Sequence, residues 1–376
     1  MKQSVPIWKP HFTITSSIVK ALMEIESARV TVAHTRLTPA KEAEFRHRAR
    51  VRSSHYSTRI EGNRLTLMQA EQVIKEPRRI FHGRERDVRE VRNYWDALLR
   101  VEEWAARKQP LTEDLIRRLH ALVEKGLRSK PSPYRTGQNV IRDSSSGAIV
   151  YMPPEAKDVP QLMAGLIHWA ERAEKEGVPV PIVAALVHYQ FVTIHPYYDG
   201  NGRTARLLAT FILHRGGFSL NGFFSMEEHH ARDLEGYYRA LAVHQHHNYY
   251  EGRVQTDLTS WAEYFIQMLS RVFRMVSDEI SRPETKTKGP KSEVPQNLDH
   301  RARIVFGLFG KQSAIRTADI SRALGLSDRM ARILIHKWIA DGWLVVKGTG
   351  KRDRAYELSA IYRQSNGNLS VIPSGV

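Results

Sequence analysis

Cysteine is absent from the 376 residues, so the fold cannot contain a disulfide and its chemistry cannot use a thiolate. Long apolar runs are missing too: no segment of about 18 uncharged apolar residues is present. The first ten residues lack the apolar centre of a signal peptide. These absences argue against a disulfide-rich secreted domain and a membrane-spanning protein. They predict no membrane contact and a cytoplasmic location.

Acidic residues are few beside basic ones, with 40 Asp and Glu against 57 Lys and Arg, for a formal net charge of +17. A strongly basic chain favours a polyanion such as nucleic acid as a partner, although the distribution of charge matters more than the sum. Hydrophobic residues make up 41% and charged residues 26%, which is an ordinary globular mixture. The length allows two or three domains with cores of their own.

The most informative stretch runs from His195 to Arg206 and reads HPYYDGNGRTAR. An apolar segment, 182–194, precedes it, and its length and lack of alternation favour a buried helix. Another apolar-faced helix is predicted over 204–213. The pattern is therefore helix, tight loop, helix, with the polar side chains gathered in the loop.

The loop has the residues of an anion-binding site. Gly200 and Gly202 allow positive φ and remove side-chain bulk, so that successive backbone N–H groups can point into one concavity. The second helix begins there and adds its unpaired N–H groups and the positive end of its dipole. Arg203 and Arg206 are three residues apart and share a helix face. Two guanidinium groups over such a loop suit a polyphosphate.

Two further side chains supply chemistry. Asp199 is a lone carboxylate beside this positive site, as expected for a ligand of Mg²⁺ that arrives with substrate phosphates. His195 precedes the loop, and an imidazole of ordinary pKa, about 6.5, suits a general base near neutral pH. The alternative is a glycine-rich helix–helix turn with a surface arginine pair. A bare Gly-Asn-Gly would favour that alternative, but the full string argues against it.

This stretch resembles the Fic motif, His-Pro-Phe-x-Asp/Glu-Gly-Asn-Gly-Arg-x-x-Arg, with Tyr197 where Phe is usual. The resemblance implies a protein adenylyltransferase that transfers AMP from ATP to a Ser, Thr or Tyr hydroxyl of a target protein or of itself. It implies His195 as the catalytic base and Asp199 as the Mg²⁺ ligand. It implies that ATP binds at a set of motif residues, namely Gly200, Asn201, Gly202, Arg203 and Arg206.

A second resemblance lies upstream, in residues 53–63. On propensity alone Glu61 is the end of a helix, with Gly62 near its C-cap. A carboxylate at a helix C-terminus opposes the dipole and benefits from a cationic partner. The segment resembles the inhibitory helix of Fic proteins, with Ser57, Glu61 and Gly62 at the matching positions. That resemblance implies that Glu61 pairs with Arg206 and blocks productive seating of the γ-phosphate.

Residues 131–154 contain two short β-prone runs, 138–142 and 148–152, around a polar turn, and they predict a hairpin. In Fic proteins the corresponding element is a flap whose edge pairs with the target by main-chain hydrogen bonds. The resemblance therefore assigns target docking to Val140, Ile141 and Arg142. A hairpin that only decorates the surface is the alternative.

Aromatic and histidine residues follow the motif. Tyr237 and Tyr238 lie where aromatics of the family line the nucleotide base, and core packing is an equal alternative. Gln245 is a weak candidate for a polar contact to the base. The histidines at 244, 246 and 247 could bind a metal, but adjacent side chains on a helix diverge and no acid is suitably spaced.

Other segments read as scaffold. Helices are predicted over 17–30, from Pro39 with a very basic face, through the apolar stripes between 68 and 99, from Thr112 to about Val123, and over 159–174. The basic run comprises Arg46, Arg48, Arg50 and Arg52, and it predicts a solvated face.

The last quarter of the chain differs in composition. Residues 281–298 lack periodicity and predict a linker. Beyond it, a helix, a turn with Gly325, a second helix capped by Ser327 and a β-hairpin resemble a winged helix-turn-helix. From Arg282 onward there are 17 basic and 8 acidic residues. Arg329, Arg332 and Lys337 on the second helix, with wing residues Lys351, Arg352 and Arg354, suit DNA phosphates, and binding of a protein is an equal alternative.

The sequence therefore predicts a mostly α fold: a Fic-type helical core with a β-hairpin flap, an N-terminal helical region and a C-terminal winged helix-turn-helix. The expected domains are residues 1–108, 109–280 and 300–376, with a linker over 281–299. The predicted activity is an autoinhibited protein adenylyltransferase using ATP and Mg²⁺, with a homodimer also compatible. The alternatives are a DNA-binding regulator whose core senses a nucleotide, and removal of AMP or transfer of another nucleotide from the same site.

Overall fold

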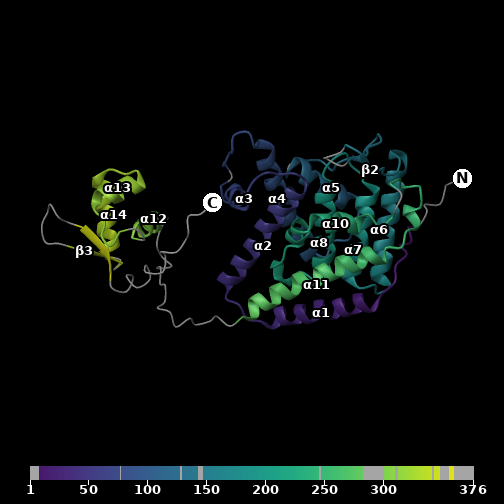
Figure 1. The fold of residues 1–376 in the computed structure, drawn as a ribbon, viewed down its shortest axis with the longest axis horizontal. Helices are drawn as coiled ribbons and strands as arrows, with labels where there is room; N and C mark the ends of the chain where they lie inside the picture. Colours follow the sequence, from purple (N-terminus) through teal and green to yellow (C-terminus); the bar gives the residue numbers. More distant parts are fainter. Residues whose placement is uncertain are drawn as a thin grey trace. The chain divides into compact units, whose positions relative to one another are not determined.

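The structure is a computed structural model that describes residues 8–76, 78–127, 129–142, 147–244, 247–282, 300–309, 312–340, 343–347 and 355–359. The chain forms two compact units, Met1–Arg282 and Pro283–Val376. Both are predominantly helical, as the sequence predicts (Figure 1). The linker is expected over 281–299; the structure places Ser281 at the end of a helix, and residues 283–299 lie outside the described residues. Among the helices that are described, none is long and apolar enough to cross a bilayer.

Helix α7 (Val180–Ile194) is the centre of the larger unit. Nearly all of its side chains are buried, which is typical of a helix that is apolar on every face. It packs against α6 (Val159–Lys175), α8 (Asn201–Arg215) and α11 (Thr259–Ser281). The central pair, α7 and α8, carries the predicted loop between its ends, so this loop rests on two of the most buried helices of the core.

Further helices close the core around this pair. Helices α4 (Glu85–Ala106) and α5 (Glu113–Lys125) pack on α8. The α5 helix begins as expected, because Thr112 Oγ1 accepts from Leu115 N at 3.2 Å. The shorter elements are α9 (Met226–Arg232), α10 (Leu234–Leu241) and the 3₁₀ turns Ala156–Asp158, Leu220–Gly222 and Arg253–Gln255.

Helix α1 (Ser16–His34) lies alongside α11 (Figure 1). Polar contacts mark the seam: Gln267 Nε2 donates to Ser17 Oγ at 2.7 Å, and Ser270 Oγ donates to Glu24 at 2.6 Å. The residue numbers rise together along both helices, so the two run in the same direction. The N-terminal helix is thereby tied to the end of the larger unit rather than left as a free arm.

Helix α2 (Pro39–Ile60) starts with proline in its first turn, as predicted, and contacts α3 (Leu67–Lys75), α4 and α9. Its buried face is largely polar, and comprises Ser53, Ser54, His55, Ser57 and Thr58 together with Ala49, Val51 and Ile60. The helix that carries the predicted inhibitory residues is therefore held to the core in large part by hydrogen bonds and ion pairs.

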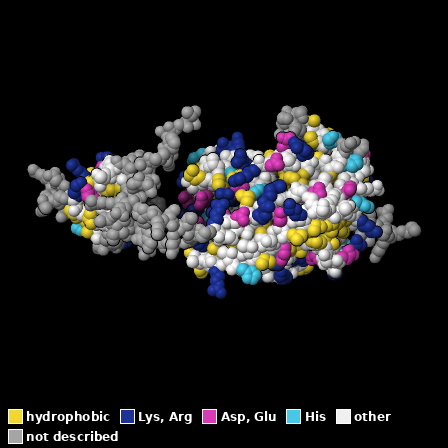
Figure 2. Space-filling model, turned by 60° about the horizontal axis from the view of Figure 1, so that its bottom comes forward, with side chains coloured by type: hydrophobic (Ala, Val, Ile, Leu, Met, Phe, Trp, Pro, Cys, Tyr) yellow, Lys and Arg dark blue, Asp and Glu magenta, His cyan; other side chains and the backbone are white. Residues whose placement is uncertain are grey.

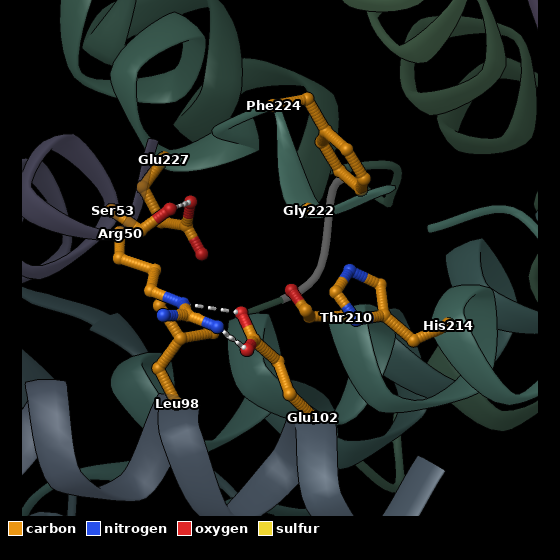
Figure 3. A pocket seen from close by; sticks show the side chains of 9 residues that line it. All are labelled: Arg50, Ser53, Leu98, Glu102, Thr210, His214, Gly222, Phe224 and Glu227. Carbon is orange, nitrogen blue, oxygen red and sulfur yellow. Dashed lines mark hydrogen bonds and ion pairs between the residues drawn. The ribbon is translucent and has the colours of Figure 1, made fainter. Parts of the chain in front are cut away.

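The prediction of a solvated basic face on α2 is only partly right, because the side chains of its four arginines are 24–40% exposed and three of them pair with carboxylates of other helices. Arg50 binds Glu102 of α4 with both Nε and Nη2, and Arg52 Nη1 lies 2.6 Å from Glu228 of α9. Figure 3 shows the Arg50–Glu102 pair in a small pocket beside Ser53, which donates to Glu227. The side chains of Arg50 and Arg52 are 24% and 36% exposed, and their partners are carboxylates of neighbouring helices, which a charge run in the sequence does not reveal.

The predicted hairpin is present as antiparallel strands β1 (Ile141–Arg142) and β2 (Ile149–Tyr151). The predicted turn residues 143–146 lie outside the described residues. Beyond β2, Met152 forms a parallel bridge with Asn248. The base of the hairpin is thus fixed to the body of the larger unit.

The described residues of the smaller unit form the helices α12 (His300–Leu308), α13 (Thr317–Leu324) and α14 (Asp328–Ala340). Strands β3 (Leu344–Lys347) and β4 (Ala355–Leu358) then pair antiparallel, which is the element order expected of a winged helix. Gly325 ends α13 in the left-handed region, and Ser327 Oγ accepts from Met330 N at 3.4 Å. The wing residues Lys351, Arg352 and Arg354 lie outside the described residues.

Candidate active site

His195 ends α7 in the left-handed conformation, with φ 51° and ψ 60°. Its backbone N–H donates to Phe191 O at 3.0 Å, and its ring Nδ1 lies 3.2 Å from Val192 O. An Nδ1–H that donates to this carbonyl leaves Nε2 as a proton acceptor. Burial lowers the pKa of His195 to about 4, against the opposing effects of the Val192 carbonyl and Glu61. The imidazole is therefore neutral at pH 7, the form that a general base requires.

The loop after His195 is braced from inside. The Tyr197 ring is buried and stacks on His120, with ring centroids 3.5 Å apart. Asn201 Nδ2 donates to Tyr197 O at 2.8 Å, and Asn201 Oδ1 accepts from Tyr197 N at 3.0 Å. The tyrosine ring is thus buried at the position where the motif usually has phenylalanine. The side chain of Asn201, predicted to bind ATP, holds the loop in this structure.

Helix α8 begins at the loop, with Gly200 at its N-cap and φ 76°. Glycine is needed there for two reasons: the left-handed backbone, and a Cβ that would fall 2.4 Å from Glu124 Oε1. The first-turn amides of α8 have no acceptor within their own helix. Their N–H groups and the positive end of the helix dipole lie where the sequence predicts an anion site.

The predicted contact between Glu61 and Arg206 is present. Arg206 Nη2 donates to Glu61 Oε1 at 2.8 Å, while Nε donates to Ser57 Oγ and Nη2 also to Ser57 O, both at 2.9 Å. The Arg206 side chain is 1% exposed. Burial opposes the charge of Arg206, but the Glu61 carboxylate beside it raises its pKa. Two of the three residues predicted to be inhibitory therefore bind this guanidinium directly.

The Glu61 carboxylate also covers the start of α8. A Cβ on Gly202 would fall 2.3 Å from Glu61 Oε1, so this oxygen lies against the first turn of the helix. Glu61 is itself the C-cap of α2, and Gly62 follows it with φ 91°. An anionic group from α2 thus lies beside the first turn of α8, where backbone amides can stabilise a phosphate oxygen.

Arg203 does not share an anion with Arg206. Its Nη2 lies 2.9 Å from Glu124 Oε1 and 3.1 Å from Asp199 Oδ1, and its Nη1 lies 3.9 Å from Glu90 Oε1. Burial raises the pKa of Glu124, and Arg203 opposes that effect. The two arginines of the motif therefore have separate carboxylate partners. Those of Arg203 come from α4 and α5, and that of Arg206 comes from the end of α2.

Asp199 remains accessible, with 57% of its side chain exposed. Its Oδ1 accepts from Gly200 N at 2.6 Å, and its Oδ2 lies 3.5 Å from Arg86 Nη2. The described residues contain no group of three or more His, Cys, Asp or Glu side chains that could hold a metal. An exposed carboxylate fits a Mg²⁺ ion whose other ligands are phosphate oxygens and water.

The two tyrosines assigned to the base differ in exposure. Tyr237 is 1% exposed and its hydroxyl lies 3.1 Å from His188 Nε2, so its ring belongs to the core. Tyr238 is 49% exposed and is the one that a ligand can reach. Gln245 and His246 lie outside the described residues, and His247 Nδ1 lies 2.7 Å from Val150 O.

The residues predicted to dock a target lie on the hairpin. Val140 and Ile141 are partly buried, while Arg142 is exposed and Nη1 donates to Gly147 O at 2.9 Å. The hairpin is linked to the loop between α7 and α8, called here the catalytic loop, through Asn139, whose Nδ2 donates to Tyr197 O at 3.1 Å. A hydrogen bond therefore joins the base of the hairpin directly to this loop.

Sequence reasoning missed several residues of the site. Arg135 donates to the carbonyl of His195, and Glu90 and Glu124 surround Arg203. No periodicity or motif spacing marks these positions. They come from segments 60 to 120 residues away in sequence, and only the packing of α4, α5 and the hairpin base brings them to the loop.

Comparison with known proteins agrees with this geometry. Residues 110–213 match the model of the Fic/DOC family. A protein adenylyltransferase Fic from Drosophila grimshawi is 32% identical over 179 residues, and one from Nematostella vectensis is 32% identical over 180 residues. Each alignment covers 47% of this chain, and the chain spans only 34% and 39% of these relatives.

Solved structures extend the likeness beyond this domain. A Fic family protein from Desulfovibrio desulfuricans G20 is 27% identical, covers 94% of this chain and 99% of its own, and has a TM-score of 0.61. A Fic domain-containing signaling protein from Bacteroides thetaiotaomicron, 24% identical, covers 70% of this chain and 97% of its own with a TM-score of 0.58, and shares the fold. A helical fold with this histidine loop defines a Fic-type domain. The chain therefore carries a region, residues 110–213, that matches the Fic/DOC family.

Proposed function

We propose that the protein is a protein adenylyltransferase that transfers AMP from ATP to a Ser, Thr or Tyr hydroxyl of a target protein or of itself. One observation carries the proposal: Arg206 of α8 already holds an anion, the carboxylate of Glu61, which lies against Gly202 in the first turn of that helix. A site built for an anion lies beside the neutral imidazole of His195. The names of the curated relatives support the same activity.

In the proposed reaction, His195 Nε2 takes the proton from the incoming hydroxyl. The hydroxyl oxygen then forms a bond to the α-phosphorus of ATP, and the bond from that phosphorus to the bridging oxygen of the β-phosphate breaks. Pyrophosphate leaves, and AMP stays on the target oxygen. The amides of Gly202 and its neighbours, with Arg206, hold the phosphates, so the protein contributes chiefly position and charge.

ATP and Mg²⁺ are the proposed substrate and metal. Asp199 fits one place in the metal's coordination sphere, because its carboxylate is exposed beside the phosphate site. Mg²⁺ would supply charge neutralisation for the leaving pyrophosphate. Tyr238 is the exposed aromatic side chain available to the adenine ring, and Arg142 and its neighbours on β1 would pair with the target's main chain.

Autoinhibition is part of the proposal. Glu61 and a phosphate oxygen would compete for the same guanidinium and the same helix N-terminus, so the resting enzyme would hold ATP poorly or in a non-productive position. Ser57 adds two contacts that keep the Arg206 guanidinium turned toward α2. Removal of the Glu61 carboxylate alone should free Arg206 from its carboxylate partner without disturbing α2.

The test is mass spectrometry of the full chain after incubation with ATP and Mg²⁺. The Glu61→Gly variant should gain the mass of AMP, whereas the Glu61→Gly, His195→Ala double variant should not. A Glu61→Gln variant keeps the side-chain volume and removes the charge. It is the matched control that separates the effect of the Glu61 charge from that of its side-chain volume. No AMP on any residue of the Glu61→Gly protein, with or without added target proteins, would contradict the proposal. Loss of AMP from a pre-labelled protein would identify the reverse reaction instead.

A second function is proposed for the smaller unit, which is binding of duplex DNA. The observation that favours it is the exposed face of α14, where Arg329, Ile333 and His336 follow one another at helical spacing and Arg332 lies beside them. Basic side chains suit phosphates, and an exposed isoleucine suits a thymine methyl group. Such a face would let the second helix of the pair enter a major groove.

This second proposal predicts binding that weakens steeply with salt. Fluorescence anisotropy of the full chain with a mixed-sequence duplex, between about 50 and 200 mM salt, measures that dependence. The Arg329→Ala, Arg332→Ala variant should lower the slope by about two, one for each lost phosphate contact. An Arg172→Ala, Lys175→Ala variant removes two charges from α6 and serves as the control. Equal binding by the parent and the α14 variant would exclude this face as the DNA site.

A further inference from the structure

Arg135 has an unusual environment for a charged side chain. It is buried, and within the described part of the chain no carboxylate pairs with it. Its guanidinium instead donates to three backbone carbonyls: Nε to His195 O at 2.9 Å, Nη1 to Gly137 O at 3.0 Å, and Nη2 to Pro154 O. Its own backbone N–H donates to Pro196 O at 2.9 Å.

The three acceptors belong to three different segments. His195 O lies at the C-terminal end of α7, where the negative end of the helix dipole favours a cation. Gly137 precedes the hairpin and Pro154 follows it, so these two carbonyls flank β1 and β2. The planar fork of a guanidinium can hold three carbonyls in one fixed arrangement, which a lysine cannot do.

Burial of an unpaired guanidinium is costly, and it lowers the pKa of Arg135. A neutral side chain could fill this space at a smaller desolvation cost, so packing alone does not account for an arginine here. What the guanidinium provides is a connection between the backbone of His195 and both ends of the hairpin.

We propose that Arg135 is a positioning residue that fixes the backbone of His195 against the target-docking hairpin. Because φ and ψ of His195 set the direction of its ring, a held carbonyl keeps the imidazole at a constant distance from a hydroxyl presented by the hairpin. The inference rests on the proposed transfer reaction at His195. It adds a residue that touches neither ATP nor the target.

Neighbouring contacts hold the loop without reaching His195. Gly137 N donates to Tyr198 Oη at 2.8 Å, and Asn139 Nδ2 donates to Tyr197 O at 3.1 Å. These bonds keep the loop near the hairpin base when Arg135 is changed. Loss of the Arg135 guanidinium should therefore release the His195 carbonyl while the fold of the loop persists.

The experiment uses the full chain with Glu61→Gly as the parent. Arg135→Met should lower kcat for AMP transfer at least about 100-fold, the effect of a displacement of about 1 Å, with the Kd of a non-hydrolysable ATP analogue within about twofold. Arg117→Met is the matched control: Arg117 Nε donates to Ser132 O at 2.9 Å in the same region without touching the catalytic loop. Its kcat should stay within about threefold of the parent.

Two measurements separate positioning from a general loss of structure. Methylguanidinium added to Arg135→Ala should restore part of kcat, because the small cation can fill the vacated fork. The ring NMR signals of His195 should move in Arg135→Met, and its pKa should rise, because a positive charge is removed. Glu61 (Gly in the parent), Asp199 and the Val192 carbonyl are the other groups that act on this ring, and they are the same in parent and variant.

A kcat within threefold of the parent would overturn the proposal, as would equal losses in kcat and in affinity for the ATP analogue. A parent that transfers no AMP would instead contradict the proposed function. In that case the His195 signals decide the role of Arg135: unchanged ring shifts and an unchanged pKa in Arg135→Met would overturn it.

Discussion

Asn63 Nδ2 donates to Glu90 Oε2 at 3.0 Å. The other oxygen of Glu90 lies 3.9 Å from Arg203 Nη1. Glu61, two residues before Asn63 in the chain, binds Arg206. The end of α2 therefore reaches both arginines of the motif, one directly and one through a carboxylate of α4. Removal of Glu61 would free only one of the two.

The first prediction concerns this second connection. Asn63 is buried, donates also to Asp87 O, and accepts from Leu65 N. Asn63→Ala should destabilise the larger unit by about 1–3 kcal/mol, because buried partners lose their hydrogen bonds. It should also raise self-labelling with ATP above that of the unsubstituted protein, but less than Glu61→Gly does, since the Glu61–Arg206 contact stays.

Urea unfolding and mass spectrometry measure these two effects. Asn93→Ala is the control, because Asn93 is equally buried and donates to Val123 O at 3.2 Å, away from α2. It should lower stability without raising self-labelling. Equal labelling in the Asn63 and Asn93 variants would show that the Asn63–Glu90 bond has no part in inhibition.

The sequence predicts the central helices, the loop and the Glu61–Arg206 pair because these features depend on local signals. A continuous apolar run identifies α7, an apolar face identifies α8, and glycine with arginine at fixed spacing identifies the loop between them. The pair follows from two resemblances: Glu61 lies in the short inhibitory motif, and its partner Arg206 lies in the Fic motif. The hairpin follows from two β-prone runs around a turn, and its described strands pair as expected.

The remainder of the site depends on tertiary packing. Arg203 was expected to share a phosphate with Arg206, but α4 and α5 bring Glu90 and Glu124 against it. The sequence predicts that Arg50 is solvated, but its guanidinium forms an ion pair with Glu102. In each case the sequence shows the charge and not the opposite charge that a neighbouring helix supplies.

The second prediction concerns Gly200. Alanine at this position should destabilise the larger unit more than alanine at Gly177, although both glycines have φ 76°. The left-handed backbone costs about 1–2 kcal/mol at either position. At Gly200 the new Cβ would also fall 2.4 Å from Glu124 Oε1, whereas nothing lies within 4 Å at Gly177.

The difference between the two variants, measured by urea unfolding, reports the collision alone. The Glu124 side chain would have to leave Arg203, so Gly200→Ala should also loosen that ion pair. Equal losses of stability at the two glycines would mean that Glu124 moves aside freely and does not hold Arg203.

The third prediction concerns the attachment of α2 to the core. Glu227 is buried and accepts from Ser53 Oγ at 2.8 Å, Ser225 Oγ at 3.0 Å and Tyr94 Oη at 2.9 Å, and its contact with Ser53 lies in the pocket of Figure 3. Glu227→Ala would leave three buried hydroxyl groups without their acceptor. It should cost about 3 kcal/mol, and hydrogen exchange should speed up in α2 before α7.

Arg100→Ala provides a contrast, because it removes a partly exposed contact to Glu103 and should cost about 0–1 kcal/mol. Uniform acceleration of exchange across α2 and α7 in Glu227→Ala would mean that α2 unfolds only with the whole unit. In that case the helix would not be a separately released element.

The last prediction concerns acid. Burial lowers the pKa of His55, His120, His195 and His214 to about 4 and that of His188 to about 3, each from an ordinary value near 6.5. These histidines are neutral in the folded protein between pH 4 and 6.5, but the unfolded chain binds protons there. Their contribution to stability is complete above pH 6.5 and is lost as the pH falls toward 4.

The Tm should therefore fall steeply between pH 6.5 and 4.5, with each histidine adding a slope of about 1.4 kcal/mol per pH unit to the free energy of unfolding. His214 lines the pocket of Figure 3, away from the catalytic loop, and His214→Gln should reduce proton uptake on unfolding at pH 5 by about one. Calorimetry in buffers of different ionisation enthalpy measures that uptake. A Tm that is the same at pH 7 and pH 5 would mean that these imidazoles gain protons without unfolding, and that His195 is not held neutral by its surroundings.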